Sequence, residues 1–285
     1  MGLKMAPPQT GGLDIKESEF RTIRKLVYDH FGINLTDQKR SLVVGRLQKV
    51  LRQRGLPDFR SYIEWLQSDQ SGEALEELAN RISTNHTYFW RENNHFEYFR
   101  DTAVAEAAAR RRAMGDRIRI WCAGCSSGEE PYTLVMLMKE ALGADYQALK
   151  PVLLASDISA TALRTAMSGV YSGERLTQMP ESLKRKYFRK GPQAGTWQVS
   201  DEVRGEIVFR RHNLMNTTFP FKHAFDAVFC RNVMIYFDRP TRDALVARFH
   251  RHTVSGGYLF IGHSETLGRD GQLYDYVMPA AYRRK

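Results

Sequence analysis

A turn of small residues between an expected strand and an expected helix limits what this chain can fold into more than any other feature. Residues 121–132 read WCAGCSSGEEPY, after a strand pattern at 117–120 and before a helix pattern at 129–142. Glycine and serine have little side chain, so such a backbone can approach a ligand closely, and free N–H groups at the helix start face that ligand. Glu129 and Glu130 in the first helical turn would repel a phosphate. The loop therefore suits a ligand that carries positive charge, not a nucleotide polyphosphate.

Composition bounds the class of protein. The chain has 285 residues, 42% of them apolar, which is enough for one large domain or two modest ones. No apolar run reaches about 18 residues, so no membrane span is expected, and residues 1–12 are interpreted as a flexible tail, not a signal peptide. Three cysteines, an odd number, argue against a disulfide framework and predict a reducing, cytoplasmic location.

The net charge of +10 is unevenly distributed along the chain. From Lys16 to Arg60 there are eleven Lys or Arg against five Asp or Glu, which leaves +6 in under a fifth of the chain. One interpretation is a basic protein with no special partner, and the other is a polyanionic or acidic partner. A basic stripe on one expected helix consists of Lys39, Arg46 and Lys49.

Residues 13–90 predict a helical domain that ends in a hinge. The spacing of apolar residues predicts helices over 17–31, 36–54, 58–66 and 73–82. Thr36 is expected to cap the second of these helices. The hinge, 83–91, runs from polar residues into an aromatic cluster, which suits a segment packed over a cleft.

From residue 91 onward the pattern changes to short apolar strands that alternate with helices, which predicts an α/β fold with a mostly parallel sheet covered on both faces. The expected strands are 118–122, 152–156, 207–210, 227–230 and 258–262. The expected helices are 92–112, 129–142, 159–168 and 240–252. Residues 172–205 interrupt the alternation and predict a small antiparallel insertion, and the segments 273–277 and 281–284 predict a closing hairpin.

Polar residues after the expected strands are candidates for ligand binding, because open α/β sheets bind ligands beyond the carboxyl ends of their strands. Asp157 ends the second strand, where an acid commonly holds ribose hydroxyls; its alternative role is to cap the next helix. Arg231, Asn232 and Tyr236 follow the strand at 227–230, and a core position is an equal alternative for Tyr236.

Two further motifs suggest other chemistry. Cys122 and Cys125 form a CxxC pair, but the chain offers too few further ligands for zinc, and the pair does not stand at a helix start as in redox proteins. Residues 124–128 match GxSxG, and Asp226 and His263 follow in the order of serine hydrolases. Only one expected strand precedes the motif, whereas a nucleophile elbow follows several. The histidines show no HExxH spacing, so no metal site is expected, and His263 is interpreted as structural.

In combination these motifs resemble the chemotaxis receptor methyltransferase family, CheR, over about residues 15–284. The matching stretches are 84–92, 124–132, 155–158, 225–238 and 262–265. Trp90 stands where the family usually has Phe, which should alter only packing. The resemblance implies a helical N-terminal domain followed, from residue 91 to 285, by a Rossmann-like, class I S-adenosylmethionine-dependent methyltransferase domain with its insertion at 172–205.

The activity implied is methyl transfer from S-adenosyl-L-methionine to glutamate side chains on the acidic cytoplasmic helices of chemoreceptors, with S-adenosyl-L-homocysteine as product. We expect a cytoplasmic monomer that binds no nucleic acid and does not insert directly into a membrane, and the resemblance leaves open whether a receptor tail peptide binds the insertion. One alternative is a non-catalytic signalling module, and another is a serine hydrolase that uses Ser126. A nucleic-acid methyltransferase is disfavoured, since the N/D-P-P-Y/F tetrapeptide is absent.

The resemblance also implies roles for single residues. Glu129, nearer the turn than Glu130, is the first choice for the methionine amino group, and Asp157 is expected at the ribose hydroxyls. The other implied cofactor contacts are Asn85, Thr87, Arg91, Asn213, Leu214, Arg231 and Asn232. Arg91 and Tyr236 are expected to orient the cofactor tail and the incoming carboxylate. The stripe of Lys39, Arg46 and Lys49 is expected to dock acidic receptor helices.

Overall fold

The computed structural model describes residues 14–83, 86–268 and 272–285, which form two compact units. The first unit comprises the chain up to His30 together with 34–82, and the second comprises 31–33 and 83–285. The expected tail at 1–12 and the candidate Asn85 lie outside the described residues. Within the described ranges, no helix has both the length and the apolar content needed to cross a membrane.

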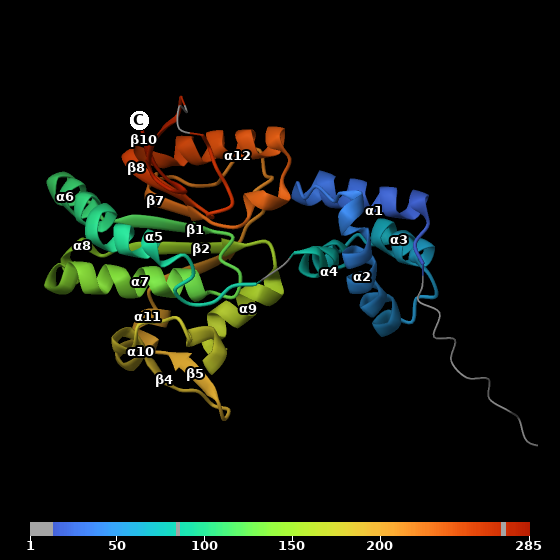
Figure 1. The fold of residues 1–285 in the computed structure, drawn as a ribbon, viewed down its shortest axis with the longest axis horizontal. Coiled ribbons are helices and arrows are strands. Elements are labelled where there is room, and N and C mark those ends of the chain that lie inside the picture. Colours follow the sequence, from blue (N-terminus) through green and yellow to red (C-terminus); the bar gives the residue numbers. More distant parts are fainter. Residues whose placement is uncertain (1–13, 84–85, 269–271) are drawn as a thin grey trace, which may run out of the picture. The chain divides into compact units, whose positions relative to one another are not determined.

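The first unit is helical, as its apolar spacing predicts (Figure 1). Its helices are α1 (Glu17–Phe31), α2 (Arg40–Arg54), α3 (Phe59–Ser68) and α4 (Glu73–Ile82). Each contributes one apolar face to a shared core, with members such as Phe20, Leu47, Tyr62 and Leu78 completely buried. The helical domain therefore has a core of its own.

The capping role expected of Thr36 is wrong. The segment after Thr36 begins as a 3-10 turn, η1 (Asp37–Lys39), and α2 starts only at Arg40. The Thr36 side chain makes no capping hydrogen bond; its backbone carbonyl instead accepts from Lys39 N at 2.9 Å. The tighter i to i+3 turn satisfies the backbone in place of the side chain.

The second unit is built on a sheet that has seven strands among the described residues, in the order β6-β2-β1-β7-β8-β10-β9. The strands are β1 (Arg119–Ala123), β2 (Val152–Asp157), β6 (Ile207–Arg211), β7 (Phe225–Cys230), β8 (Thr253–Ile261), β9 (Tyr274–Met278) and β10 (Ala281–Arg284). The first five in spatial order pair in parallel, and β9 and β10 add the predicted hairpin in antiparallel orientation. The mostly parallel sheet is confirmed.

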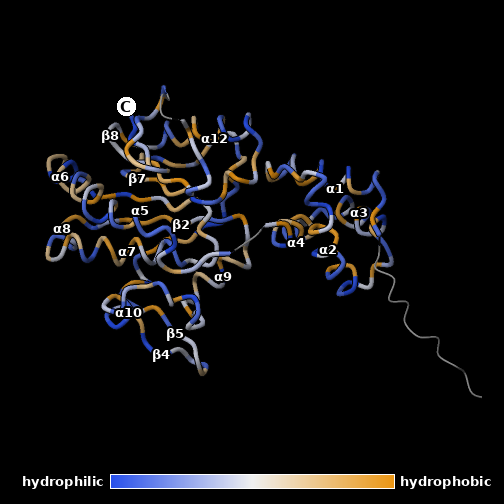
Figure 2. The backbone as a smooth tube through the Cα atoms, in the orientation of Figure 1, coloured by the Kyte–Doolittle hydropathy of each residue, from blue (hydrophilic) through white to orange (hydrophobic). Residues whose placement is uncertain are grey.

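Successive side chains of each strand point to opposite faces of the sheet, so the sheet has one hydrophobic core on each face. Ile120 and Cys122 of β1 belong to a core shared with helices that precede and follow β1, whereas Trp121 and Ala123 belong to a core shared with α12. The first face is covered by α5 (Asn93–Tyr98), the π-helical turn η2 (Phe99–Ala103), α6 (Val104–Met114) and α7 (Glu129–Leu142), and the second by α12 (Arg239–His252). Figure 2 shows hydrophobic residues concentrated on the central strands.

The insertion forms a second, smaller sheet with the strand order β3-β5-β4. Its elements are β3 (Val170–Ser172), η4 (Gly173–Leu176), α10 (Glu181–Tyr187), β4 (Phe188–Lys190), β5 (Thr196–Val199) and α11 (Asp201–Arg204). The first strand starts at Val170, two residues before the predicted boundary at 172, directly after α9 (Ala160–Ser168). The short elements η3 (Gly143–Asp145) and α8 (Tyr146–Leu149) connect α7 to β2.

Candidate functional site

A cavity of about 1040 Å³, counting the part open to solvent, lies at the carboxyl ends of the parallel strands of the second unit. The chain leaves β1 toward β2 and β6 on one side, while β7 and β8 lie on the other, so the strand order reverses between β1 and β7. Such a reversal is where doubly wound sheets bind ligands. Loops after β1, β2, β6 and β7 all contribute to the lining.

Most of the residues expected at the site are brought together here. Those lining the cavity are Thr87, Arg91, Asp157, Asn213, Leu214, Arg231, Asn232 and Tyr236. They come from the hinge and from three different strand ends, so the fold gathers residues that are far apart in sequence.

The turn after β1 lines the cavity, and Gly124 stands in it at a point where a side chain would not fit. Gly124 has φ +88°, and a Cβ there would lie 2.5 Å from Val233 Cγ2. Ser126, with φ +50°, also has a left-handed backbone, and its N–H donates to Asp157 Oδ2 at 2.7 Å. Ser126 lines the cavity, and its hydroxyl oxygen is buried without a hydrogen-bond partner among the described residues. The turn thus brings a backbone of small residues to the cavity wall.

The two carboxylates at the start of α7 have different surroundings. Glu130 lines the cavity, where its Oε2 lies 2.9 Å from Arg231 Nη1 and its Oε1 accepts from Cys122 Sγ at 3.1 Å. Glu129 does not line it: the side chain is completely buried and pairs with Ser127 Oγ and with Arg175 of η4. Successive helical residues point about 100° apart, and here Glu130 is the one that points into the cavity. The assignment of Glu129 to the methionine amino group stays a prediction.

Asp157 occupies the end of β2 and is nearly buried. Its Oδ1 accepts from Ser159 N at 2.9 Å, and its Oδ2 accepts the bond from Ser126. Burial raises the pKa of Asp157 above its ordinary value, although these N–H donors oppose the shift. The helix α9 is capped by Ser159, whose hydroxyl accepts from Ala162 N at 3.1 Å, so the alternative capping role of Asp157 is taken by another residue.

The loop after β6 places Asn213 and Leu214 at the cavity. Asn213 Oδ1 accepts from Met215 N at 3.0 Å, and Leu214 O accepts from Arg248 Nη2 at 2.9 Å. These bonds fix an amide and an apolar side chain beside one another. Such a pair suits a flat ring that has polar edges.

Arg231, after β7, is the most connected cation at the site. Besides Glu130, it contacts Glu92 Oε2 through Nη2 at 3.0 Å, and it donates to the carbonyl oxygen of Arg91. Its guanidinium also lies 4.9 Å from the ring centre of Phe96. With a side chain only 3% exposed, Arg231 is held between two carboxylates, as burial of a charge requires.

Two acids that sequence reasoning left without a role hold this loop. Glu92 Oε1 accepts from Asn232 Nδ2 at 3.1 Å, and burial acts to raise its pKa, but Arg231 and Asn232 outweigh burial and keep the pKa below its ordinary value. Glu265 accepts from Asn232 N and Ile235 N, both at 3.0 Å. Asn232 has φ +58°, so its strained backbone is held by both acids. Glu92 and Glu265 lie in the matching stretches 84–92 and 262–265, and this position in the sequence could have indicated that they belong to the site.

The hinge residues line one side of the cavity. Arg91 Nη1 donates to His86 O at 2.8 Å, and Thr87 O accepts from Arg175 Nη1 at 3.2 Å. Arg175, which sequence reasoning also missed, therefore ties the insertion to the hinge. Tyr236 lines the cavity from the 3-10 turn η5 (Met234–Tyr236).

The basic stripe does not have three equivalent members. Lys49 is exposed and Lys39 is partly exposed on the helical unit. Arg46 instead donates to Ile82 O at 2.7 Å and to Arg81 O at 3.3 Å, where it satisfies carbonyls at the end of α4. Arg46 thus has a structural role within its own unit.

The serine hydrolase triad is not assembled. Asp226 lies near the start of β7, at the opposite end of the parallel strands from Ser126, and its carboxylate pairs with Arg110 and Arg111. In the CxxC pair, burial raises the pKa of both thiols well above their ordinary values, so neither is a ready nucleophile.

Comparisons with known proteins identify one family. A family model described as "CheR methyltransferase, SAM binding domain" matches residues 85–281, and one described as "CheR methyltransferase, all-alpha domain" matches residues 18–83. A chemotaxis protein methyltransferase of Borreliella burgdorferi is 40% identical over 273 residues, which cover 95% of this chain and 96% of that protein. A chemotaxis protein methyltransferase of Escherichia coli is 38% identical over 260 residues, which cover 90% of this chain and 87% of that protein.

Proposed function

The chain belongs to the CheR methyltransferase family, and from this premise we propose that it methylates glutamate side chains on the cytoplasmic helices of chemoreceptors. It is a methyltransferase with an S-adenosylmethionine-binding domain of class I fold. The observation that carries the proposal is the cavity at the reversal of strand order. It combines the carboxylate of Glu130, at the start of α7, with the carboxylate of Asp157, at the end of β2. We place the reaction in the cytoplasm and propose that the protein acts as a monomer.

The residues present fit S-adenosylmethionine. Its ammonium and sulfonium charges match Glu130, the cavity carboxylate of α7. Its ribose hydroxyls match Asp157, and its adenine matches the amide and apolar pair of Asn213 and Leu214. Gly124 and Ser126 line the cavity and carry little or no side chain, which suits a ligand that lies against the turn.

When bound, S-adenosylmethionine supplies an activated methyl group that a nucleophile can accept. A glutamate carboxylate has a reference pKa of about 4.3, so the substrate is already ionised near neutral pH and needs no general base. The work left to this chain is alignment and exclusion of water. In the proposal, Arg91 and Tyr236 orient the incoming carboxylate and the cofactor tail, with Asn85 and Thr87 closing the hinge side. Arg231 and Asn232 fix the wall beside the methionine moiety.

The proposed test uses the chemical lability of glutamyl methyl esters. Purified protein is incubated with membranes that contain a chemoreceptor and with tritiated S-adenosylmethionine. Label should enter the receptor band and leave as volatile methanol after mild alkali, since esters hydrolyse there and N-methyl amines do not. Base-stable label, or label in nucleic acid, would refute glutamate methylation. A receptor whose acceptor glutamates are replaced by alanine is the matched control.

A further inference from the structure

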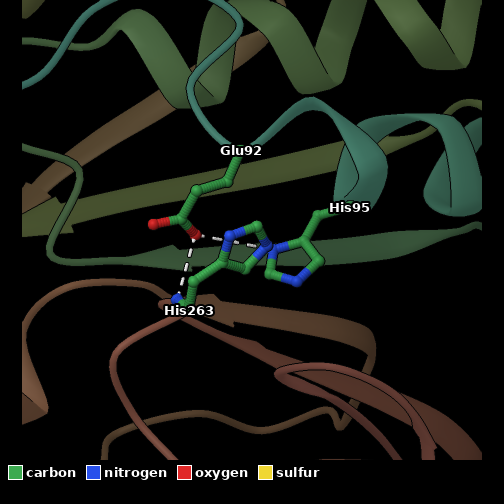
Figure 3. A group of neighbouring side chains, drawn as sticks. All are labelled: Glu92, His95 and His263. Atoms are coloured by element: carbon green, nitrogen blue, oxygen red, sulfur yellow. Dashed lines mark hydrogen bonds and ion pairs between the residues drawn. The ribbon is translucent and has the colours of Figure 1, made fainter.

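Three side chains beside the cofactor cavity turn their donor atoms toward one another (Figure 3). Glu92 reaches in from the end of the hinge, His95 from α5, and His263 from the loop after β8. One donor atom of each lies within 4.8 Å of the others, and Glu92 Oε2 is 3.8 Å from His95 Nδ1. The group was invisible in sequence, because His263 is 171 residues from Glu92.

The tautomer of His95 follows from its hydrogen bond. Its Nε2 lies 2.9 Å from Pro279 O, and a carbonyl oxygen only accepts, so the ring proton is on Nε2. The lone pair is then on Nδ1. This atom belongs to a completely buried side chain and has no hydrogen-bond partner among the described residues. A buried nitrogen without a partner is rare in folded proteins and calls for an explanation, and a bound cation between it and the Glu92 carboxylate would provide one.

His263 contributes one ring nitrogen to the group. Its Nε2 lies 3.0 Å from Asn94 Oδ1, and when Nε2 donates to that oxygen the lone pair is on Nδ1. Its backbone N–H donates to Glu92 Oε2 at 3.3 Å. Because His263 is exposed, solvent can reach the group from this side. An imidazole whose second nitrogen donates to an oxygen acceptor is the usual arrangement of a metal-binding histidine.

We propose that Glu92, His95 and His263 form a binding site for a divalent transition metal ion of the zinc type. Two imidazole nitrogens and one carboxylate are ligands that zinc, cobalt and nickel accept, and tetrahedral ligands at about 2.1 Å from the metal lie roughly 3.4 Å apart. The 3.8 Å between Glu92 Oε2 and His95 Nδ1 is close to that spacing. Water completes the coordination from the exposed side.

The metal ion competes with an arginine of the cofactor cavity. Arg231 contacts the same Oε2 of Glu92, at 3.0 Å, and Arg91 Nε lies 3.9 Å from its Oε1. These cations oppose a dication, whereas Glu130 favours it, so we expect binding weaker than that of a structural zinc site. Metal binding draws Glu92 away from Arg231 and Asn232, which line the cavity. Metal and cofactor therefore weaken each other's binding by the same factor; this coupling rests on the proposed function, whereas the metal site does not.

Cobalt(II) titration of the full chain, followed by visible absorption, tests the site. We expect one ion per chain, with a spectrum that lacks the near-ultraviolet thiolate band that Cys122 or Cys125 would give. His263→Ala should weaken cobalt binding at least tenfold, and it should fold because the side chain is exposed. His223→Ala, which removes another exposed histidine outside the group, should bind as the parent does. Equal binding by His263→Ala and the parent, or a thiolate band, would overturn the site.

Calorimetry with S-adenosylhomocysteine tests the coupling. Saturating cobalt should raise its dissociation constant at least threefold in the parent and leave it unchanged in His263→Ala. Unchanged affinity in the metal-loaded parent refutes the coupling. If no form binds S-adenosylhomocysteine, the proposed function fails, while the cobalt spectrum still decides the metal site.

Discussion

Arg231 and Glu130 form an ion pair inside the cofactor cavity, with Nη1 2.9 Å from Oε2 and both side chains largely buried. The pair joins the loop after β7 to the first turn of α7, across the point where the strand order reverses. The second carboxylate partner of Arg231 is Glu92, which directly follows the hinge. One guanidinium thus links three segments around the cavity.

Glu130→Gln should weaken binding of S-adenosylhomocysteine at least tenfold, because it removes the carboxylate that faces the ligand's ammonium. Calorimetry measures the affinity. The matched variant is Glu129→Gln, which removes the charge paired with Arg175 and should cost about 2 kcal/mol of unfolding free energy, with a smaller effect on affinity. A larger loss of affinity for Glu129→Gln than for Glu130→Gln would contradict the assignment.

Arg91→Ala should lower methyl transfer at least tenfold while the melting temperature stays near that of the parent. The side chain lines the cavity and is partly exposed, so its loss removes orientation of the reactants and little packing. The tritiated methyl assay and thermal denaturation provide the two readouts. Arg100→Ala, an exposed arginine paired with Asp101, is the control. Normal turnover by Arg91→Ala removes this residue from the site.

Cofactor affinity should fall as the pH is lowered. The fall should begin at a higher pH than it would if the pKa of Asp157 had its ordinary value. Burial raises the pKa of Asp157, so this carboxylate takes up a proton, and stops accepting fully from ribose hydroxyls, before an exposed aspartate would. Calorimetry from about pH 7.5 to about pH 5, all above the reference pKa of about 3.9, follows the change. His86 and His212 also line the cavity and could contribute to a pH dependence. The Asp157→Asn variant therefore shows how affinity changes with pH in the absence of the Asp157 carboxylate. An identical pH profile in that variant would exclude Asp157 as the cause.

Receptor docking by the helical unit should depend on Lys39 and Lys49. Replacing both by alanine should lower receptor affinity at low salt, with a smaller effect at high salt where surface charges are screened. Arg46 is left intact because it holds the end of α4, so its removal would destabilise the unit. Co-sedimentation with receptor membranes measures the affinity. No change at low salt would show that the acidic helices bind elsewhere.

The sequence predicted elements well where local periodicity decides them. The strand expected at 152–156 is β2 (Val152–Asp157), and the helix expected at 129–142 is α7 with the same bounds. A helix or strand forms where its own apolar residues repeat at the right interval, and that interval is visible in the chain. The family resemblance, drawn from five short motifs, is confirmed by the two family models.

The sequence by itself determined which segments become strands and which residues stand at their carboxyl ends, and it predicted a ligand crevice there. Only the tertiary structure decided that Glu130, not Glu129, faces the cavity, because Arg175 from the insertion binds the other carboxylate. It also decided that Glu92, His95 and His263 meet. Periodicity tells which way a side chain points from its own element; which charges become neighbours depends on how distant segments pack, since buried charges must find partners wherever the fold provides them.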